Sequence, residues 1–187
     1  MRNLLAFTLL LSSIIASAQI KEGAKVVDLS LSYSNANGSD FFFIQPLIGF
    51  GTSENEVVYA GISYSHQKND FGGGTNKSNF TSFIIGYEQF IELNPKVYFS
   101  PFISGSYGFG KSEGSGTESD QNGFSFSLRP RLHYFMNSKW SVVASVGVIQ
   151  YTRQVAKNAF GESTSDVFSM NLNSTNVFFG IRLNLNN

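Results

Sequence analysis

Large apolar and small polar residues alternate along most of the chain beyond residue 26. In 27–33, apolar residues hold the odd positions, while Asp28, Ser30 and Ser32 hold the even ones. The same two-residue period recurs in 58–65, 81–88, 99–109, 124–134 and 177–185. This period is typical of a β-strand whose two faces meet different surroundings. Two further segments, 41–51 and 139–153, are apolar at both parities, so the pattern does not fix their facing. Together the segments predict eight strands.

The connections between these strands alternate in length. Long polar, glycine-rich stretches are expected as loops at 35–40, 67–78, 111–122 and 154–167. Short turns are expected near 52–55, 92–95 and 137–138. Long loops at one end, tight turns at the other and an even strand count are typical of an up-and-down barrel with both termini at the short-turn end.

The volume of the apolar residues indicates which face of this barrel is apolar. The interior of an eight-stranded barrel is only just filled by side chains, and about 40 bulky apolar residues would not fit inside it. Serine, glycine, asparagine and a few charges suit such an interior, and an apolar outer face suits lipid. The predicted fold is therefore all-β, an eight-stranded antiparallel up-and-down transmembrane β-barrel. A soluble barrel of the lipocalin type, with its apolar face inward, is the alternative.

Aromatic residues near the strand ends are expected to form girdles at the two membrane interfaces. The chain holds 19 Phe and 8 Tyr but a single Trp. The girdle candidates are Tyr33, Phe41, Phe50, Tyr64, Phe80, Phe90, Tyr134, Trp140 and Tyr151.

The N-terminus has the features of a secretory signal peptide. Arg2 precedes the apolar run 4–16, and Ala16-Ser17-Ala18 has the small-x-small pattern of a cleavage site. We therefore expect residues 1–18 to be a cleaved signal peptide and 19–187 to be one outer-membrane β-barrel domain, without a further domain. The run is too short for a transmembrane helix.

Composition excludes several classes of function. Thirteen basic residues balance thirteen acidic ones, so there is no basic field for nucleic acid. The chain has no cysteine, which removes disulfides, thiol chemistry and lipid attachment at a cysteine. No spacing of His, Asp and Glu suggests a metal site, and we expect no cofactor.

Three stretches carry a resemblance to a known family: 83–90, 99–110 and the last strand, 177–185. With them the chain resembles the OmpA-like and OmpX-like eight-stranded outer-membrane barrels, and most closely the porin-family-like small barrels of Bacteroidetes. The last strand is similar to the C-terminal signal that the outer-membrane assembly machinery recognises, on Phe179, Gly180, Ile181, Leu183 and Leu185. Leu185 stands where that signal usually has a terminal aromatic residue. The resemblance implies location in the cell outer membrane and contact with its lipid and lipopolysaccharide.

Two patterns could carry catalytic or nucleotide chemistry. Residues 105–112 fit G-x-x-x-x-G-K-[ST], but a P-loop needs a helix after the loop, and 113–120 is unsuited to one. Some eight-stranded outer-membrane barrels are lipid A acyl-modifying enzymes that use a histidine, a serine and a carboxylate. Neither His66 nor His133 lies in a His-x-Ser arrangement. We therefore expect no catalysis and keep such an enzyme as the last alternative.

Several charged residues fall on the polar parity of their strands and are expected inside the barrel. Buried charges need partners, so we predict an interior ion-pair network in which the two carboxylates pair with some of the three arginines. Its members are Asp28, Glu88, Arg129, Arg131, His133 and Arg182. The alternative is a narrow channel or a conduit for small ligands. The loops are expected to meet an extracellular partner that their residues do not identify.

Overall fold

The computed structural model describes residues 20–36, 38–71, 74–114, 117–171 and 177–185, and within them every regular element is a strand. The expected signal peptide, 1–18, lies outside the described residues. Within the described part, no helix is long and apolar enough to cross a membrane. The strands are β1 (Lys25–Ala36), β2 (Ser39–Ser53), β3 (Glu56–Phe71), β4 (Gly74–Gln89), β5 (Ile91–Asn94), β6 (Val97–Gly114), β7 (Thr117–Phe135), β8 (Trp140–Val146), β9 (Val148–Asn158), β10 (Gly161–Asn171) and β11 (Val177–Asn184).

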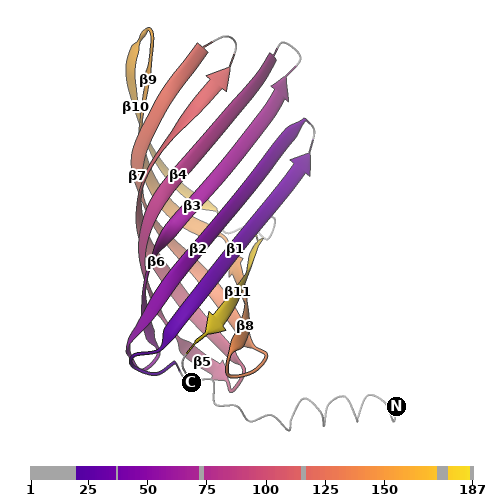
Figure 1. Ribbon diagram of the computed structural model, residues 1–187, viewed down its shortest axis with the longest axis vertical. Helices are drawn as coiled ribbons and strands as arrows, with labels where there is room; N and C mark the ends of the chain where they lie inside the picture. Colours follow the sequence, from indigo (N-terminus) through magenta and orange to yellow (C-terminus); the bar gives the residue numbers. More distant parts are fainter. Residues whose placement is uncertain (1–19, 37, 72–73, 115–116, 172–176, 186–187) are drawn as a thin grey trace, which may run out of the picture.

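All the strands belong to one antiparallel sheet whose pairings return to their starting point (Figure 1). The circuit runs β1–β2–β3–β4–β6–β7–β8–β11 and comes back to β1. β7 pairs with β8 through its last residues and with β9 through its earlier ones. The first and last strands are thus neighbours, and the amide of Leu185 donates to the carbonyl of Lys25 (2.8 Å).

The described residues form eleven strands where the pattern predicts eight, and three local features explain the difference. β5 occupies most of the expected turn 92–95 and pairs with β6. Gly147, with φ 77°, divides the expected strand 139–153 into β8 and β9, since a left-handed residue interrupts a strand. β10 lies in and beyond the expected loop 154–167.

The four long loops were predicted wrongly, because most of their residues continue the strands as β-hairpins. Antiparallel pairing continues to the adjoining ends of β1 and β2, β3 and β4, β6 and β7, and β9 and β10. Directly opposed residues include Lys68 with Lys77 and Lys157 with Glu162. Near their ends, the β3–β4 and β6–β7 hairpins are polar on both faces, so the period-two hydrophobic signal vanishes there although backbone pairing continues. The β9–β10 hairpin instead exposes apolar side chains such as Phe168 and Met170.

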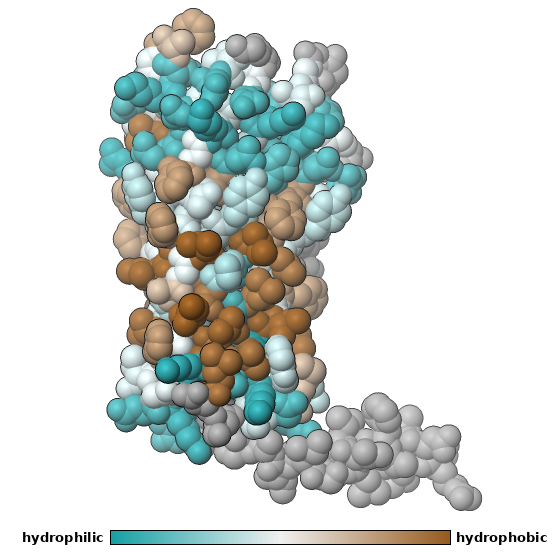
Figure 2. Space-filling model, in the orientation of Figure 1, coloured by the Kyte–Doolittle hydropathy of each residue, from teal (hydrophilic) through white to brown (hydrophobic). Residues whose placement is uncertain are grey.

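The apolar parity of the strands faces outward, as predicted. Ile85 and Tyr33 are each 70% exposed, and Phe83, Ile103 and Phe126 are also exposed. In 41–51, where the pattern leaves the facing open, Ile48 is exposed and Leu47 is buried. Figure 2 shows hydrophobic side chains across the lower half of one face, between hydrophilic zones on the hairpins and at the turn end.

Two of the predicted girdle residues lie inside instead of at the surface. Phe90 is buried, and Phe80 lines an internal cavity. Phe90 follows the last residue of β4, where the backbone leaves the ladder. Its amide donates to the carbonyl of Asn55 (2.7 Å). The strand pattern alone does not anticipate this turn of the chain.

Buried apolar side chains fill the turn end of the interior. We call this cluster the aromatic plug; it contains Ile20, Ala24, Val26, Leu47, Val57, Tyr59, Ile84, Phe90, Tyr98, Phe102 and Phe135. Tyr59 meets Phe102 edge-on at 5.7 Å, and Tyr98 meets Phe135 in the same way at 5.1 Å. Gly86 makes room for it, because a Cβ there would lie 2.7 Å from the Phe102 ring.

Candidate functional site

A buried charged cluster lies beside the aromatic plug, centred on Arg182 of β11. Its guanidinium donates from Nε to Asp28 Oδ1 (2.6 Å), and from Nη2 to Asp28 Oδ2 (2.8 Å) and Glu88 Oε2 (2.6 Å). Asp28 on β1 and Arg182 on β11 are also directly opposed in the sheet. The guanidinium carbon lies 4.8 Å from the centroid of the Phe90 ring. One side chain therefore joins carboxylates from β1 and β4.

Glu88, on β4, collects the remaining polar groups of the cluster. Its carboxylate accepts from the hydroxyls of Tyr59 (2.7 Å) and Ser100 (2.6 Å) and lies 3.0 Å from His133 Nε2. Glu88, His133 and Arg182 are fully buried. A buried carboxylate is tolerated when charge and hydrogen bonds compensate for its lost hydration, and these neighbours supply both.

Arg131 completes the charge balance from β7. Its Nη1 lies 3.3 Å from Asp28 Oδ2 and 3.5 Å from Glu88 Oε1. Its guanidinium carbon lies 3.7 Å from the centroid of the Phe102 ring, in cation–π contact. Two arginines thus face two carboxylates, and the charged cluster of Asp28, Glu88, Arg131, His133 and Arg182 connects four strands.

The structure brings together five of the six predicted interior residues. Arg129, the sixth, lies two residues before Arg131 on β7, and its Nη1 donates to Gln45 Oε1 (3.4 Å) at the cavity. Tyr59 and Ser100 contact Glu88 but were missed as members of the network. Both occupy the inward parity of their strands, which was the available signal.

Ser100, His133 and Glu88 form a compact group whose geometry differs from a catalytic relay. Ser100 Oγ lies 2.8 Å from His133 Nε2, the same nitrogen that meets Glu88. In a relay, the carboxylate orients the histidine through its other nitrogen. The three side chains are also fully buried, away from the outer surface.

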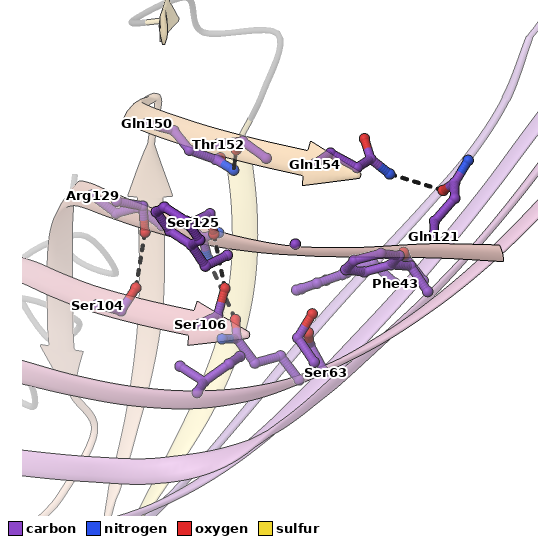
Figure 3. Close-up of a pocket in the computed structure, with 18 of the residues that line it drawn as sticks. Phe43, Ser63, Ser104, Ser106, Gln121, Ser125, Arg129, Gln150, Thr152 and Gln154 are labelled. Carbon is purple, nitrogen blue, oxygen red and sulfur yellow. Dashed lines mark hydrogen bonds between the residues drawn. The ribbon is translucent and has the colours of Figure 1, made fainter. Parts of the chain in front are cut away.

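A polar cavity of about 300 Å³ lies on the hairpin side of the charged cluster. Figure 3 shows its labelled side chains, which come from β2, β3, β6, β7 and β9. Hydroxyls and amides predominate in the lining, which includes Ser63, Ser65, Ser78, Ser82, Ser104, Ser106, Ser125, Ser127, Thr152, Gln45, Gln121, Gln150 and Gln154. A further void of about 10 Å³ lies between Arg129 and Arg131, about enough for one water molecule.

The remaining sequence motifs lie on regular strands of the sheet. The stretch 105–112, which fits the P-loop pattern, lies within β6. His66 lies on β3, with Nδ1 2.7 Å from Asn79 Oδ1. Among the described residues, no group of three His, Cys, Asp or Glu could hold a metal ion. On the last strand, Phe179, Ile181 and Leu185 are exposed, and Gly180 and Leu183 are half-buried.

Charged side chains also pair on the hairpins. Lys68 Nζ donates to Asp70 Oδ2 (2.7 Å), and the Thr75 hydroxyl donates to Asp70 Oδ1 (2.6 Å). The hydrogen bond from Lys68, followed by that from Thr75, holds the pKa of the Asp70 carboxyl below its usual range.

Replacing Lys68 with glutamine is expected to raise the Asp70 pKa toward its ordinary value, because the larger stabilisation of the carboxylate is lost. The measurement is an NMR titration of the Asp70 side-chain carboxyl in the folded protein. Lys157→Gln serves as the matched control, since Lys157 is an exposed lysine on another hairpin and is not among the groups that act on the Asp70 carboxyl. An Asp70 pKa unchanged by Lys68→Gln would show that the pair does not persist in solution.

The antiparallel circuit, the apolar exterior and the polar interior together define an outer-membrane type of β-barrel. The chain belongs to the outer membrane protein beta-barrel domain family, whose model matches residues 5–184.

A similar solved structure supports the fold. A major outer membrane protein from Thermus thermophilus is similar with a TM-score of 0.55 and 12% identity, over 87% of this chain and 98% of that one. The translocator domain of the autotransporter NalP from Neisseria meningitidis gives a TM-score of 0.45 and 15% identity, over 100% of this chain and 75% of that one. No curated protein matches the chain.

Proposed function

We propose that the mature chain is a non-conducting, eight-stranded transmembrane barrel that holds four β-hairpins outside the cell. Its role is structural or one of surface interaction, without catalysis and without a cofactor. The eight strands are those of the pairing circuit, with β5, β9 and β10 as additions to it. This count supports the finer likeness to the OmpA-like and OmpX-like barrels and to the porin-family-like proteins of Bacteroidetes.

The observation that carries the proposal is the filled turn end of the interior. The charged cluster pairs its arginines with Asp28 and Glu88, and the aromatic plug packs beside it. An ion crossing here would have to separate buried ion pairs and displace packed rings. Both steps are costly, which argues against the narrow-channel alternative.

The geometry also argues against a membrane-embedded lipid A acyl-modifying enzyme. Such chemistry needs its catalytic groups where lipid can reach them. Ser100, His133 and Glu88 are fully buried inside the sheet and make their shared contact through one histidine nitrogen. His66 is accessible, but its described side-chain contact is with Asn79 and not with a carboxylate.

The partners follow from the surfaces. The exposed apolar side chains of the strands, which include Phe83, Ile85, Ile103 and Phe126, form an apolar band that would contact outer-membrane lipid. The charged side chains of the hairpins, such as Lys68 and Lys111, would meet lipopolysaccharide. The exposed Phe179, Ile181 and Leu185 of the last strand support recognition by the outer-membrane assembly machinery after export by the cleaved signal peptide 1–18. The polar hairpins are the surface available to an extracellular partner.

The purified protein is expected to leave a planar lipid bilayer non-conducting. The same preparation should migrate differently on SDS gels before and after boiling, because a closed hydrogen-bonded barrel resists SDS until it is heated. The gel shift is the control that folded protein was applied. Reproducible conductance steps from heat-modifiable protein would contradict the closed interior and favour the channel.

A further inference from the structure

The cavity has a lining whose chemistry is unusually uniform. Eight serines, one threonine and four glutamines contribute to it. Ser104 and Ser106 on β6 face Ser127 and Ser125 on β7, each pair at 2.8 Å between the hydroxyl oxygens. A hydroxyl offers one donor and two acceptor positions, so each pair keeps capacity for a ligand. Such a surface matches a molecule that carries several hydroxyl groups.

The charge of the cavity is positive and comes from its inner end. Among the described residues that line it, Arg129 is charged and none is a carboxylate. A planar guanidinium matches a carboxylate through two parallel hydrogen bonds. With a single cation, the site suits one negative charge better than a phosphate dianion, and its described lining offers no carboxylate to pair with an ammonium group.

Three phenylalanines, Phe43, Phe80 and Phe124, line the cavity, and its shape restricts the ligand further. Phe43 and Phe80 line the cavity among the hydroxyls and give it an apolar surface suited to the C–H face of a sugar ring. A volume of about 300 Å³ is at the small end of ligand sites. The inner hydroxyls of Ser82, Ser104 and Ser127 are buried, whereas Ser65 and Gln121, nearer the hairpins, are half-buried. The ligand would therefore enter from the hairpin end and go no further than Arg129.

We propose that this cavity is a binding site for an acidic monosaccharide, a hydroxylated ring that bears one carboxylate. The carboxylate meets Arg129, the ring hydroxyls meet serines and glutamines, and the ring lies against Phe43 and Phe80. The proposal rests on the proposed function for one point only, that the hairpin end faces the outside of the cell. The sugar is either free or the terminal residue of a surface polysaccharide.

The test compares two sugars that differ at one carbon. Galacturonate and galactose are titrated into the detergent-solubilised barrel, and binding is followed by saturation-transfer NMR and calorimetry. Galacturonate is expected to bind at least about tenfold more tightly, the difference that a charge-assisted hydrogen bond provides. Arg129→Gln should reduce the affinity for galacturonate to that for galactose. Arg129→Lys keeps the charge but cannot form two parallel hydrogen bonds, so its affinity for galacturonate should be intermediate.

Lys111→Gln is the matched control, because it removes one positive charge from the exposed face of β6, outside the cavity lining. It should leave both affinities unchanged, and all variants must keep the SDS gel shift. As a second approach, Ser106→Leu with Ser125→Leu fills the cavity and should abolish binding of both sugars. Equal binding of the two sugars, no binding, or unchanged binding to Arg129→Gln and Arg129→Lys would each overturn the proposal.

A short oligogalacturonate distinguishes the two sources of the sugar. Binding at least as tight as that of the monomer supports a polysaccharide end, and binding of the monomer alone supports a free sugar acid. Failure of the site is also distinguishable from failure of the proposed function. A heat-modifiable, non-conducting barrel that binds no sugar overturns this inference alone, whereas conductance steps overturn the closed barrel.

Discussion

Replacing Glu88 with alanine is expected to lower the free energy of unfolding by about 3–5 kcal/mol, the cost of breaking a buried ion pair. The variant leaves Arg182 and Arg131 with Asp28 as their remaining carboxylate in the cluster. It also removes the acceptor for the hydroxyls of Tyr59 and Ser100. Both losses occur out of contact with water, so solvent does not compensate for them.

Urea unfolding of the reconstituted protein measures this change. Trp140, the single tryptophan, lies at the turn end of β8 and reports the transition by its fluorescence. Glu88→Gln keeps a hydrogen-bond acceptor but not the charge, so its unfolding midpoint should lie between those of Glu88→Ala and the unmodified protein. Glu113→Ala, on an exposed stretch of β6, is the matched control and should leave the midpoint unchanged. Equal midpoints for Glu88→Ala and Glu113→Ala would refute the network.

Replacing Ile85 with arginine is expected to destabilise the barrel by about 2–4 kcal/mol, the range for arginine on the lipid face near the bilayer centre. Ile85 is 70% exposed among apolar neighbours that include Phe83 and Tyr107. If this face meets lipid, the guanidinium loses its hydration and lipid offers no hydrogen-bond partners in exchange. If it met water, the same exposure would make the substitution nearly neutral.

Phe160→Arg provides the comparison, because Phe160 is 88% exposed near the tip of the β9–β10 hairpin, beyond the apolar band. Its unfolding free energy should stay close to that of the unmodified protein. Both variants are unfolded in lipid vesicles and in detergent. Equal stability of the two variants in vesicles would show that the band does not lie in the hydrocarbon layer.

Hydropathy predicts strands only where their two faces meet different surroundings. Leu29 and Leu31 alternate with Asp28 and Ser30 because lipid and a polar interior lie on opposite sides of β1, and the facing of such segments could be predicted. Near the end of the β3–β4 hairpin both faces are polar, so 67–78 has no alternation and was predicted as a loop, although the backbone pairs through most of it. Backbone hydrogen bonds leave little trace in composition.

The members of the charged cluster could be predicted by parity, but their pairing could not. Glu88 and Arg182 were both expected inside, yet their contact depends on strand tilt and register across the interior. The pattern of a single strand contains neither quantity. The cavity was beyond prediction for the same reason, since Ser104 and Ser127 become a surface only when β6 and β7 align.

The pair of Asp28 and Arg182 also has a consequence for assembly. The two residues are 154 positions apart, one on β1 and the other on β11. Until the last strand reaches the first, Arg182 has neither Asp28 nor Glu88, and the sheet retains two unpaired edges. Contacts this distant in sequence form late, because the entropy of closing the loop between them must be overcome first. The charges of the interior are therefore paired in the same step that joins the two edges of the sheet. A partly closed sheet lacks both stabilising contributions, so it is unstable and closure of the barrel is cooperative.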